Sequence, residues 1–443
     1  MSGPEVLVIG GGPAGIAAAL EMARAGLVVT LCEQAPRLGG AIHRQPNNAS
    51  RRVSVPRAQR RRWQALSDAL AASPVEVLCQ HTFVGVEGNG VVLIEDRANR
   101  RIFMRNPAAL VLAVGGVERV APVPGWHLPG VVSAGGMQVM MKSTGRAPQG
   151  DVLIAGSGPL LVALAAQMVS LGNPPVAVLE RSAAPVSPLA AARLLEAPAY
   201  LVEAAGYLLP LVLAGVRWRR GAAVKSIEAT ADGRLSVTTV DSGRRERRLV
   251  VDRVALHDGL RPNSNGAKAS SSGPFVVSAG DCREVLGGVA AIADGRLAGR
   301  AVVAHLGGRP AAADATEAQL VRERRAQVTL NGFFDFSGPD PAELPDETVV
   351  CRCEGRTLGQ LRSILAAADP VSPREIKLNG RFGMGACQGR FCTEWVASFV
   401  AHQRGGSPPS VAEFVGNRWP VKPVSVSAFI EPLAPHPPSN QSE

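Results

Sequence analysis

The stretch EVLVIGGGPAG, Glu5 to Gly15, decides the fold of the N-terminal part of this chain. An apolar run of strand length leads into three closely spaced glycines, and an alanine-rich run of helical character follows. Glycines at this spacing allow a tight turn and let a pyrophosphate approach the N-terminus of the helix. A second apolar run, Val28 to Cys32, ends in an acid that can hold ribose hydroxyls. We therefore predict a dinucleotide site formed by Gly10, Gly12, Pro13, Ala14, Gly15 and Glu33.

A second copy of the fingerprint begins at Val152, in the run VLIAGSGPLL. Gly156 and Gly158 are present, and a following strand, Val176 to Leu179, ends in Glu180. Leucine stands at position 161, where the third glycine normally lets the helix pack closely on the strand. We interpret this unit as a nucleotide-binding domain retained for its shape, and productive NAD(P)H binding is the alternative.

Three further runs indicate which dinucleotide the first fingerprint binds. RLGG ends at Gly40, LVLAVGG runs from Leu110 to Gly116, and FVVSAGD runs from Phe275 to Asp281. Together these runs resemble the two-dinucleotide-binding flavoproteins of the glutathione reductase class. The resemblance implies an α/β fold with two Rossmann domains and bound FAD. It adds four cofactor contacts: Gly40, Gly115, Gly280 and Asp281. Asp281 would lie near the flavin ribityl and phosphate groups, and it could also cap the helix predicted from Val285.

Four of the seven cysteines lie close together near the C-terminus, in the runs CRCEG and GMGACQGRFC: Cys351, Cys353, Cys387 and Cys392. Four thiolates are what an iron–sulfur cluster or a structural zinc ion requires. The C-x-C pair fits zinc knuckles poorly, so the spacing favours a cluster, with zinc and a disulfide pair as alternatives. A capping box at Thr357 to Gln360 and an apolar run from Phe391 to Val400 predict that both pairs lie at helix N-termini.

The same two cysteine runs closely resemble the bacterioferritin-associated-ferredoxin-like domain, a small helical module that holds a 2Fe-2S cluster. All four cysteine positions match, and the module would cover residues 346–405. The resemblance implies that the four thiolates bind two irons and that the module transfers single electrons.

A wider resemblance covers nearly the whole chain and adds the runs PVPGWHLPGVV, residues 122–132, and RWPVKP, residues 418–423. The chain resembles the large subunits of opine oxidases, a family that includes the FAD subunit of hydrogen cyanide synthase and the α subunits of hydroxyproline and proline dehydrogenase complexes. The family implies a smaller FAD-containing partner, similar to glycine and sarcosine oxidases, that binds and oxidises the substrate. Some relatives also hold FMN at the subunit interface, and a small third subunit is compatible with the family.

The order of these motifs predicts five regions. They are a discontinuous FAD domain, 1–125 and 262–312; a second nucleotide-binding domain, 126–261; a linker, 313–345; the 2Fe-2S module, 346–405; and a C-terminal tail, 406–443. One departure from the family is a short polar loop from Ser264 to Pro274, where relatives have a longer segment before the Gly-Asp element.

Several classes of function are disfavoured by the sequence. A disulfide reductase needs two neighbouring cysteines, but the three cysteines outside the module are isolated in the sequence: Cys32, Cys79 and Cys282. No residue lies in a recognisable catalytic motif. The net charge of +10 comes with arginine clusters but with no nucleic-acid motif, so solvated faces or docking of an acidic partner are favoured.

Location and substrate remain expectations. No targeting segment is visible, so we expect a cytoplasmic chain. Glycines and prolines interrupt the apolar stretches at 152–178 and 199–216, so we expect no stable membrane insertion and at most peripheral contact with an electron-transport chain. Opines, hydroxyproline, proline and glycine are not distinguished. The relay function competes with a self-sufficient NAD(P)H-dependent reductase and with a zinc-stabilised scaffold.

Overall fold

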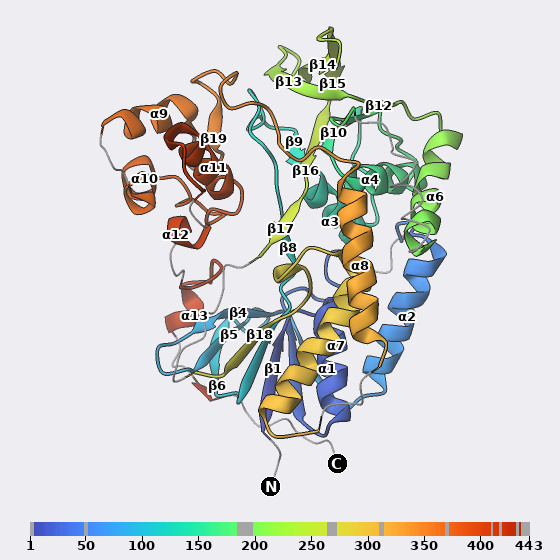
Figure 1. Ribbon diagram of the computed structural model, residues 1–443, viewed down its shortest axis with the longest axis vertical. Helices are drawn as coiled ribbons and strands as arrows, with labels where there is room; N and C mark the ends of the chain where they lie inside the picture. The colour runs from blue at the N-terminus through green and yellow to red at the C-terminus, as the bar shows by residue number, and fades with distance from the viewer. Residues whose placement is uncertain are drawn as a thin grey trace.

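Two parallel sheets lie one above the other along the long axis of the molecule, and a helical module flanks the upper one (Figure 1). The computed structural model describes residues 4–47, 52–183, 198–263, 273–309, 314–367, 372–408, 411–415, 419–430 and 434–435. Within these ranges the mixed α/β architecture agrees with the fold class predicted from the sequence.

The lower sheet carries the first glycine-rich turn. Its strand order is β18-β7-β1-β2-β3 and every pairing is parallel. The strands are β1 (Glu5–Ile9), β2 (Val28–Glu33), β3 (Glu76–Cys79), β7 (Ala109–Leu112) and β18 (Phe275–Ser278). Helices α1 (Pro13–Arg24) and α7 (Gly287–His305) pack closely on one another against this sheet. The strands are almost continuous apolar runs because helices and other strands bury both faces.

The upper sheet repeats this design with the second glycine-rich turn. Its order is β12-β11-β10-β16-β9, again parallel throughout. The strands are β9 (Val131–Ser133), β10 (Val152–Ser157), β11 (Ala177–Glu180), β12 (Trp218–Arg220) and β16 (Arg253–Asp258). Helices α3 (Ala134–Thr144), α4 (Pro159–Ser170) and α6 (Pro198–Leu213) accompany it, and a three-stranded antiparallel sheet extends from it: β13 (Ala222–Ala229), β14 (Leu235–Asp241) and β15 (Glu246–Val251).

The chain passes between the two folds twice, and the crossing segments pair with one another. Strands β8 (Gly116–Glu118) and β17 (Leu260–Pro262) form an antiparallel ribbon at this point. After the second crossing, β18 and α7 complete the lower fold, and α8 (Thr316–Asn331) runs back toward the upper one (Figure 1). Helix α8 lies within the region that the sequence assigns to the linker, 313–345.

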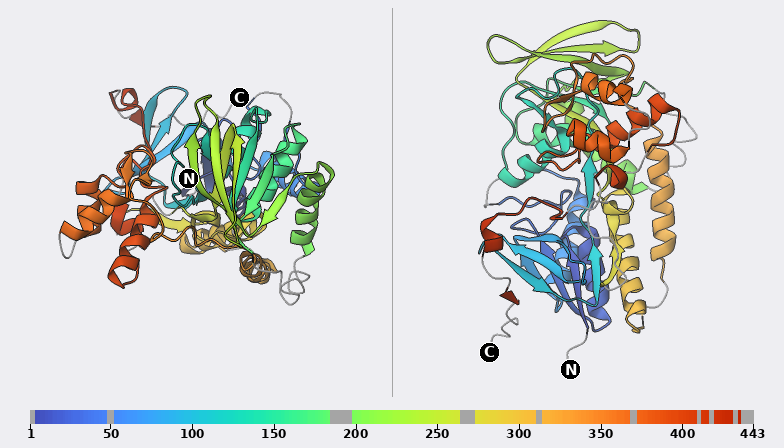
Figure 2. Two further views of the ribbon diagram at one scale, coloured as in Figure 1. Left: turned by 90° about the horizontal axis from the view of Figure 1, so that it is seen from above. Right: turned by 90° about the vertical axis from the view of Figure 1, so that its left-hand side faces the viewer.

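A small sheet covers the lower fold and receives the C-terminal tail. It consists of β4 (His81–Val86), β5 (Val92–Asp96), β6 (Arg101–Arg105) and the short β21 (Ala434–Pro435). The tail also contains α13 (Ser427–Ile430), and the view in Figure 2 shows these late segments beside the lower sheet.

The cysteine-containing module has a hydrophobic core of its own, which includes Leu358, Leu361, Ile376 and Phe399. Its elements are β19 (Val349–Cys351), β20 (Arg356–Thr357), α9 (Leu358–Ala367), α10 (Pro373–Gly380), α11 (Thr393–Arg404) and α12 (Val411–Val415). The module contacts the upper fold through Trp126, whose indole Nε1 donates to the carbonyl of Val349. The Arg352 guanidinium lies 5.1 Å from the centre of the Trp126 ring and donates to the Val131 carbonyl at 3.0 Å.

Two sequence-based expectations, the polar loop before Phe275 and the lack of membrane-spanning helices, can be compared with the described ranges only. The polar loop predicted at 264–274 lies outside them except for its last two residues, so that prediction stays open. Among the helices in those ranges, none combines the length and the apolar character needed to cross a bilayer.

Candidate functional site

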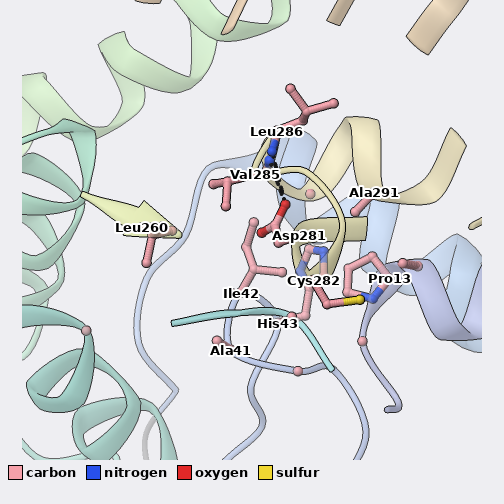
Figure 3. Close-up of a pocket in the computed structure, with 18 of the residues that line it drawn as sticks. Pro13, Ala41, Ile42, His43, Leu260, Asp281, Cys282, Val285, Leu286 and Ala291 are labelled. Carbon is pink, nitrogen blue, oxygen red and sulfur yellow. Dashed lines mark hydrogen bonds between the residues drawn. The ribbon is translucent and has the colours of Figure 1, made fainter. Parts of the chain in front are cut away.

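A cavity of about 780 Å³ lies along the carboxyl edge of the lower sheet and extends toward the upper fold. Eight of the ten predicted cofactor contacts line it: Gly10, Gly12, Pro13, Ala14, Glu33, Gly40, Gly115 and Asp281. Figure 3 shows Asp281, Ile42 and His43 around the same space. The other two predicted residues, Gly15 and Gly280, are adjacent to the lining and shape it.

The glycines of this site are required by close backbone contacts. A β-carbon on Gly15 would lie 1.9 Å from the carbonyl oxygen of Gly10, so only glycine lets α1 begin this close to β1. Gly10 itself has a φ of 109°, and a β-carbon there would lie 2.3 Å from the carbonyl oxygen of Ala113. Gly280 has a φ of 71° and faces the methyl group of Ala14. The start of α1 therefore borders the cavity with residues that carry small side chains or none, which suits the approach of a pyrophosphate to the helix N-terminus.

Glu33 ends β2 and is buried against the glycine-rich turn. Its two carboxylate oxygens accept hydrogen bonds from the backbone N–H groups of Gly11 and Ala35, each at 2.8 Å. Each oxygen retains a second lone pair, and the residue lines the cavity. The carboxylate can therefore fix the turn and accept from ribose hydroxyls at the same time.

Asp281 follows β18 in the short helix η1 (Gly280–Cys282). Its Oδ1 accepts from the N–H groups of Leu286 and Gly287, both at 3.1 Å, at the start of α7 (Figure 3). Burial raises the pKa of this carboxyl, and the two backbone donors oppose that rise. The capping role expected from the sequence is thus present in a residue that also lines the cavity.

Lys142 is a cavity residue that the sequence analysis missed. It is buried on α3, and its Nζ donates to the carbonyls of Ala41 and Ile42 at 3.1 and 3.0 Å. Burial, together with the Arg44 charge, lowers the pKa of Lys142 to about 7. Next to it, His43 stacks on Trp63 with ring centres 5.3 Å apart, and burial lowers its pKa to about 4. His43 therefore lines the cavity as a largely neutral imidazole packed on an aromatic ring.

The second glycine-rich turn is covered by the chain itself. A β-carbon on Gly158 would lie 3.2 Å from the ring of Phe336, and one on Gly259 would lie 2.9 Å from it. The backbone N–H of Asp335 donates to the Ser157 hydroxyl at 3.0 Å, and Arg181 donates to the Asp335 carbonyl at 3.3 Å. The acid at the ribose position, Glu180, is buried and accepts from Ser157, Gly158 and Ser182. Residues 335 and 336 thus lie where a nucleotide would meet this turn.

The four cysteines of the C-terminal module come together in two pairs. The thiols of Cys351 and Cys392 are hydrogen-bonded to each other, as are those of Cys353 and Cys387. The Cys392 thiol and the Gly383 N–H donate to Cys351, which lowers the pKa of the Cys351 thiol to about 6 and raises that of Cys392. Cys392 is the N-cap of α11, as expected. Cys351 and Cys353, however, lie at the β19–β20 turn and not at a helix N-terminus.

The thiol arrangement tests which metal these residues fit. In the described ranges, no three His, Cys, Asp or Glu side chains converge on one point as a single metal ion would need. A 2Fe-2S cluster has two irons that each take two thiolates, which is the number of thiols in the module. A β-carbon on Gly385 would lie 2.3 Å from the β-carbon of Cys353, so glycine leaves room beside that pair. Four thiol donors, with a glycine beside one of them, are what a 2Fe-2S cluster requires, and a structural zinc ion takes four thiolates as well.

Comparison with known proteins identifies the family. The family model described as "Pyridine nucleotide-disulphide oxidoreductase" matches residues 4–294. The chain belongs to this family. Membership makes it an oxidoreductase and implies that the first glycine-rich fold binds FAD.

Individual relatives of this oxidoreductase match it over nearly its whole length. The A subunit of opine oxidase from Agrobacterium tumefaciens (strain Ach5) is 33% identical over 96% of this chain and 90% of the relative. The HcnB subunit of hydrogen cyanide synthase from Pseudomonas protegens is 30% identical over 98% of each chain. These matches confirm the resemblance to opine oxidase large subunits, and both names describe subunits of larger enzymes. The solved L-proline dehydrogenase from P. horikoshii shares the fold, with a TM-score of 0.65 and 18% identity over 96% of this chain and 79% of that one.

In this oxidoreductase the cysteine loop and the flavin cavity share a residue. Arg390 lies between Cys387 and Cys392, and its side chain lines the cavity. Its Nη1 donates to the carbonyl of Cys387 at 3.2 Å, and its Nη2 donates to the carbonyl of Val421 at 3.1 Å. One side chain therefore connects the loop that carries two thiols with the wall of the nucleotide site.

Proposed function

We propose that the chain is the electron-transferring flavin and iron–sulfur subunit of a heteromeric oxidoreductase that acts on CH–NH bonds, of the opine oxidase type. The observation that carries this proposal is Arg390, which lines the flavin cavity and is bonded to the backbone of the thiol loop. FAD exchanges electrons in pairs or singly and a 2Fe-2S cluster exchanges them singly, so the two together convert hydride chemistry into single-electron transfer.

Residues of this chain hold and insulate the two cofactors. The N–H groups at the start of α1 bind the pyrophosphate, Glu33 accepts from the adenosine ribose, and Asp281 lies at the ribityl end. Cys351, Cys353, Cys387 and Cys392 hold the irons, while the Gly383 N–H donates to sulfur and stabilises the negative charge of the cluster.

Substrate oxidation belongs, in this proposal, to a smaller FAD-containing partner similar to glycine and sarcosine oxidases. With both groups bound, the 2Fe-2S cluster and the FAD held by this chain would supply the single-electron path from the partner's FAD to an acceptor such as a quinone. The names of the relatives support a partner because they describe subunits. Interface FMN and a small third subunit remain compatible with this assembly. We place the assembly in the cytoplasm, since a chain of 443 residues with only seven cysteines is typical of a reducing compartment.

The direct test is cofactor analysis of the complex purified anaerobically with its partner. We expect FAD and two irons per chain, and oxidation of an opine, proline, hydroxyproline or glycine by the complex but not by this chain alone. Cys387→Ser should lose the iron and keep the FAD, whereas Cys79→Ser, a half-buried cysteine outside the module, should keep both. Zinc in place of iron, or full substrate oxidation by the isolated chain, would refute the proposal.

The rival proposal, a self-sufficient NAD(P)H-dependent reductase, needs an open second site. The contacts of Phe336 and Asp335 with the second glycine-rich turn speak against it. Stopped-flow mixing with NADH and NADPH separates the two proposals, because rapid bleaching of the flavin absorbance is expected only for the reductase.

A further inference from the structure

The run RWPVKP near the C-terminus has no role in the function argued so far, yet part of it is firmly attached to the lower fold. The backbone N–H of Val421 donates to the carbonyl of Val84 on β4 at 2.8 Å, and the Val421 side chain is buried among Phe83, Leu112 and other core residues. A β-carbon on Gly85 would lie 2.8 Å from the Trp419 ring, so this glycine makes room for the indole. These contacts fix the direction of the next residue, Lys422.

Lys422 points into the flavin cavity at the end where Glu33 lies. It lines the cavity together with Glu33 and Gln34, and its Nζ donates to the Gln34 side chain. Burial and the Arg390 charge lower the pKa of Lys422 to about 8, while the Glu33 charge opposes this shift. A second positive charge, Arg97, also contributes to lowering it.

Arg390 supplies the other cation of this wall. Its guanidinium donates to two backbone carbonyls, those of Cys387 and Val421, and these contacts hold the guanidinium in place beside the cavity. Arg390 and Lys422 thus lie in the same wall, and both are only half-buried beside the cavity.

The charges at this end of the cavity indicate the charge of the ligand group that binds there. Two cations lie near one carboxylate, Glu33, whose expected partner is the ribose of the adenosine. The ADP half of FAD brings a doubly charged pyrophosphate next to that ribose. We propose that Lys422 and Arg390 clamp the ADP half of FAD, so that the 419–422 segment forms part of the cofactor site.

This inference rests on the proposed FAD binding and adds a consequence to it. Because Arg390 also holds the Cys387 carbonyl, FAD that engages Arg390 steadies the loop between Cys387 and Cys392. Loss of the clamp should therefore weaken FAD binding and also alter the surroundings of the cluster.

The test is titration of the purified protein, stripped of FAD, with FAD and separately with ADP. Lys422→Met should weaken binding of both ligands about tenfold to a hundredfold, as expected for loss of a charged hydrogen bond. Lys422→Arg should stay within a few-fold of wild type. The matched control is Lys225→Met, which removes an exposed lysine paired with Glu246 outside the cavity lining and should change neither affinity.

A second variant guards against misfolding of the first. Arg390→Gln should weaken FAD and ADP binding and also shift the electron paramagnetic resonance spectrum of the reduced cluster, whereas Arg390→Lys should preserve the ADP affinity better. Wild-type FAD and ADP affinities in folded Lys422→Met and Arg390→Gln would overturn the clamp and leave the flavin site standing. If wild-type protein itself binds no FAD, the proposed function fails instead.

Discussion

The first glycine-rich turn, Gly10 to Gly15, borders a cavity of about 780 Å³, whereas in the second turn Gly158 lies against the ring of Phe336 and the cavity lining begins only at Pro159 and Leu160 of α4. Both turns follow a buried parallel strand and precede a helix that starts with proline. The glycine pattern therefore specifies the path of the backbone in both folds. Whether a ligand can enter is decided by segments that the chain places over the turn much later in the sequence.

The two acids at the ends of the second strands differ in the same way. Glu33 receives two backbone N–H groups and also faces the cavity. Glu180 receives three donors and is not part of the cavity lining, and burial raises the pKa of its carboxyl. A carboxylate of this kind can stabilise a turn whether or not it binds a ribose, so its presence alone does not establish a nucleotide site.

The largest effect is expected at the third glycine of the first turn. Gly15→Val places side-chain atoms against the Gly10 carbonyl, so α1 cannot pack, and we expect loss of bound flavin with about 5 kcal/mol or more of destabilisation. The matching variant of the second fold, Leu161→Ala, should cost roughly 2–4 kcal/mol and keep the flavin. Flavin content and urea unfolding measure both. A flavin-replete Gly15→Val protein would show that the two turns do not differ as described.

A smaller effect is expected from the two acids. Glu33→Gln replaces an acceptor of backbone N–H groups by an amide and should weaken FAD binding about tenfold to thirtyfold. Glu180→Gln should leave FAD affinity unchanged, although it weakens the second turn. Fluorescence titration of the stripped proteins with FAD gives the affinities, and equal losses in the two variants would contradict the proposed division between an open and a closed fold.

Opening the second fold should have a modest effect on stability. Phe336→Ala removes a partly buried ring from the second turn and should cost about 2 kcal/mol while FAD content stays constant. NADH binding, measured by calorimetry, should become detectable in this variant and remain undetectable in wild type. Val328→Ala, on the exposed side of α8, is the control. If wild type already binds NADH tightly, Phe336 does not close the site.

The smallest effect concerns Lys142, which connects α3 of the upper fold to the carbonyls of Ala41 and Ile42 in the lower one. The pKa of Lys142 is about 7 in the folded protein and near 10.4 in an unfolded chain, so the unfolded state binds more protons between these values. Stability should therefore rise with pH across this window, by roughly 1 kcal/mol from pH 7 to pH 8. Lys142→Met should remove that part of the rise in urea unfolding experiments. Parallel pH profiles would rule out the effect.

The sequence predicted the features that depend on residues close together in the chain. The strand–turn–helix units follow from glycine spacing and apolar runs, and the capping box is confirmed because Thr357 and Gln360 exchange hydrogen bonds as their spacing requires. The cysteine spacing brought four thiols into one module, although the first pair proved to lie at a β-turn, because the chain forms a short hairpin before α9 begins.

The remaining features depend on contacts between distant residues. Phe336 covers a turn that lies far earlier in the chain, and nothing in the sequence around it indicates this. Lys142, Arg390 and Lys422 reach the flavin cavity from three separate elements, so no local spacing connects them. The RWPVKP run was noticed as a feature shared with a family, but only the pairing of Val421 with Val84 shows where its lysine points.

The stacking of Arg352 on Trp126 attaches the cysteine-containing module to the second nucleotide fold. The Trp126 indole donates to the Val349 carbonyl and Arg352 donates to the Val131 carbonyl, so these contacts set the position of the small helical module on that fold. In the proposed relay, this attachment would hold the separation of the two redox groups, on which the rate of electron transfer depends steeply.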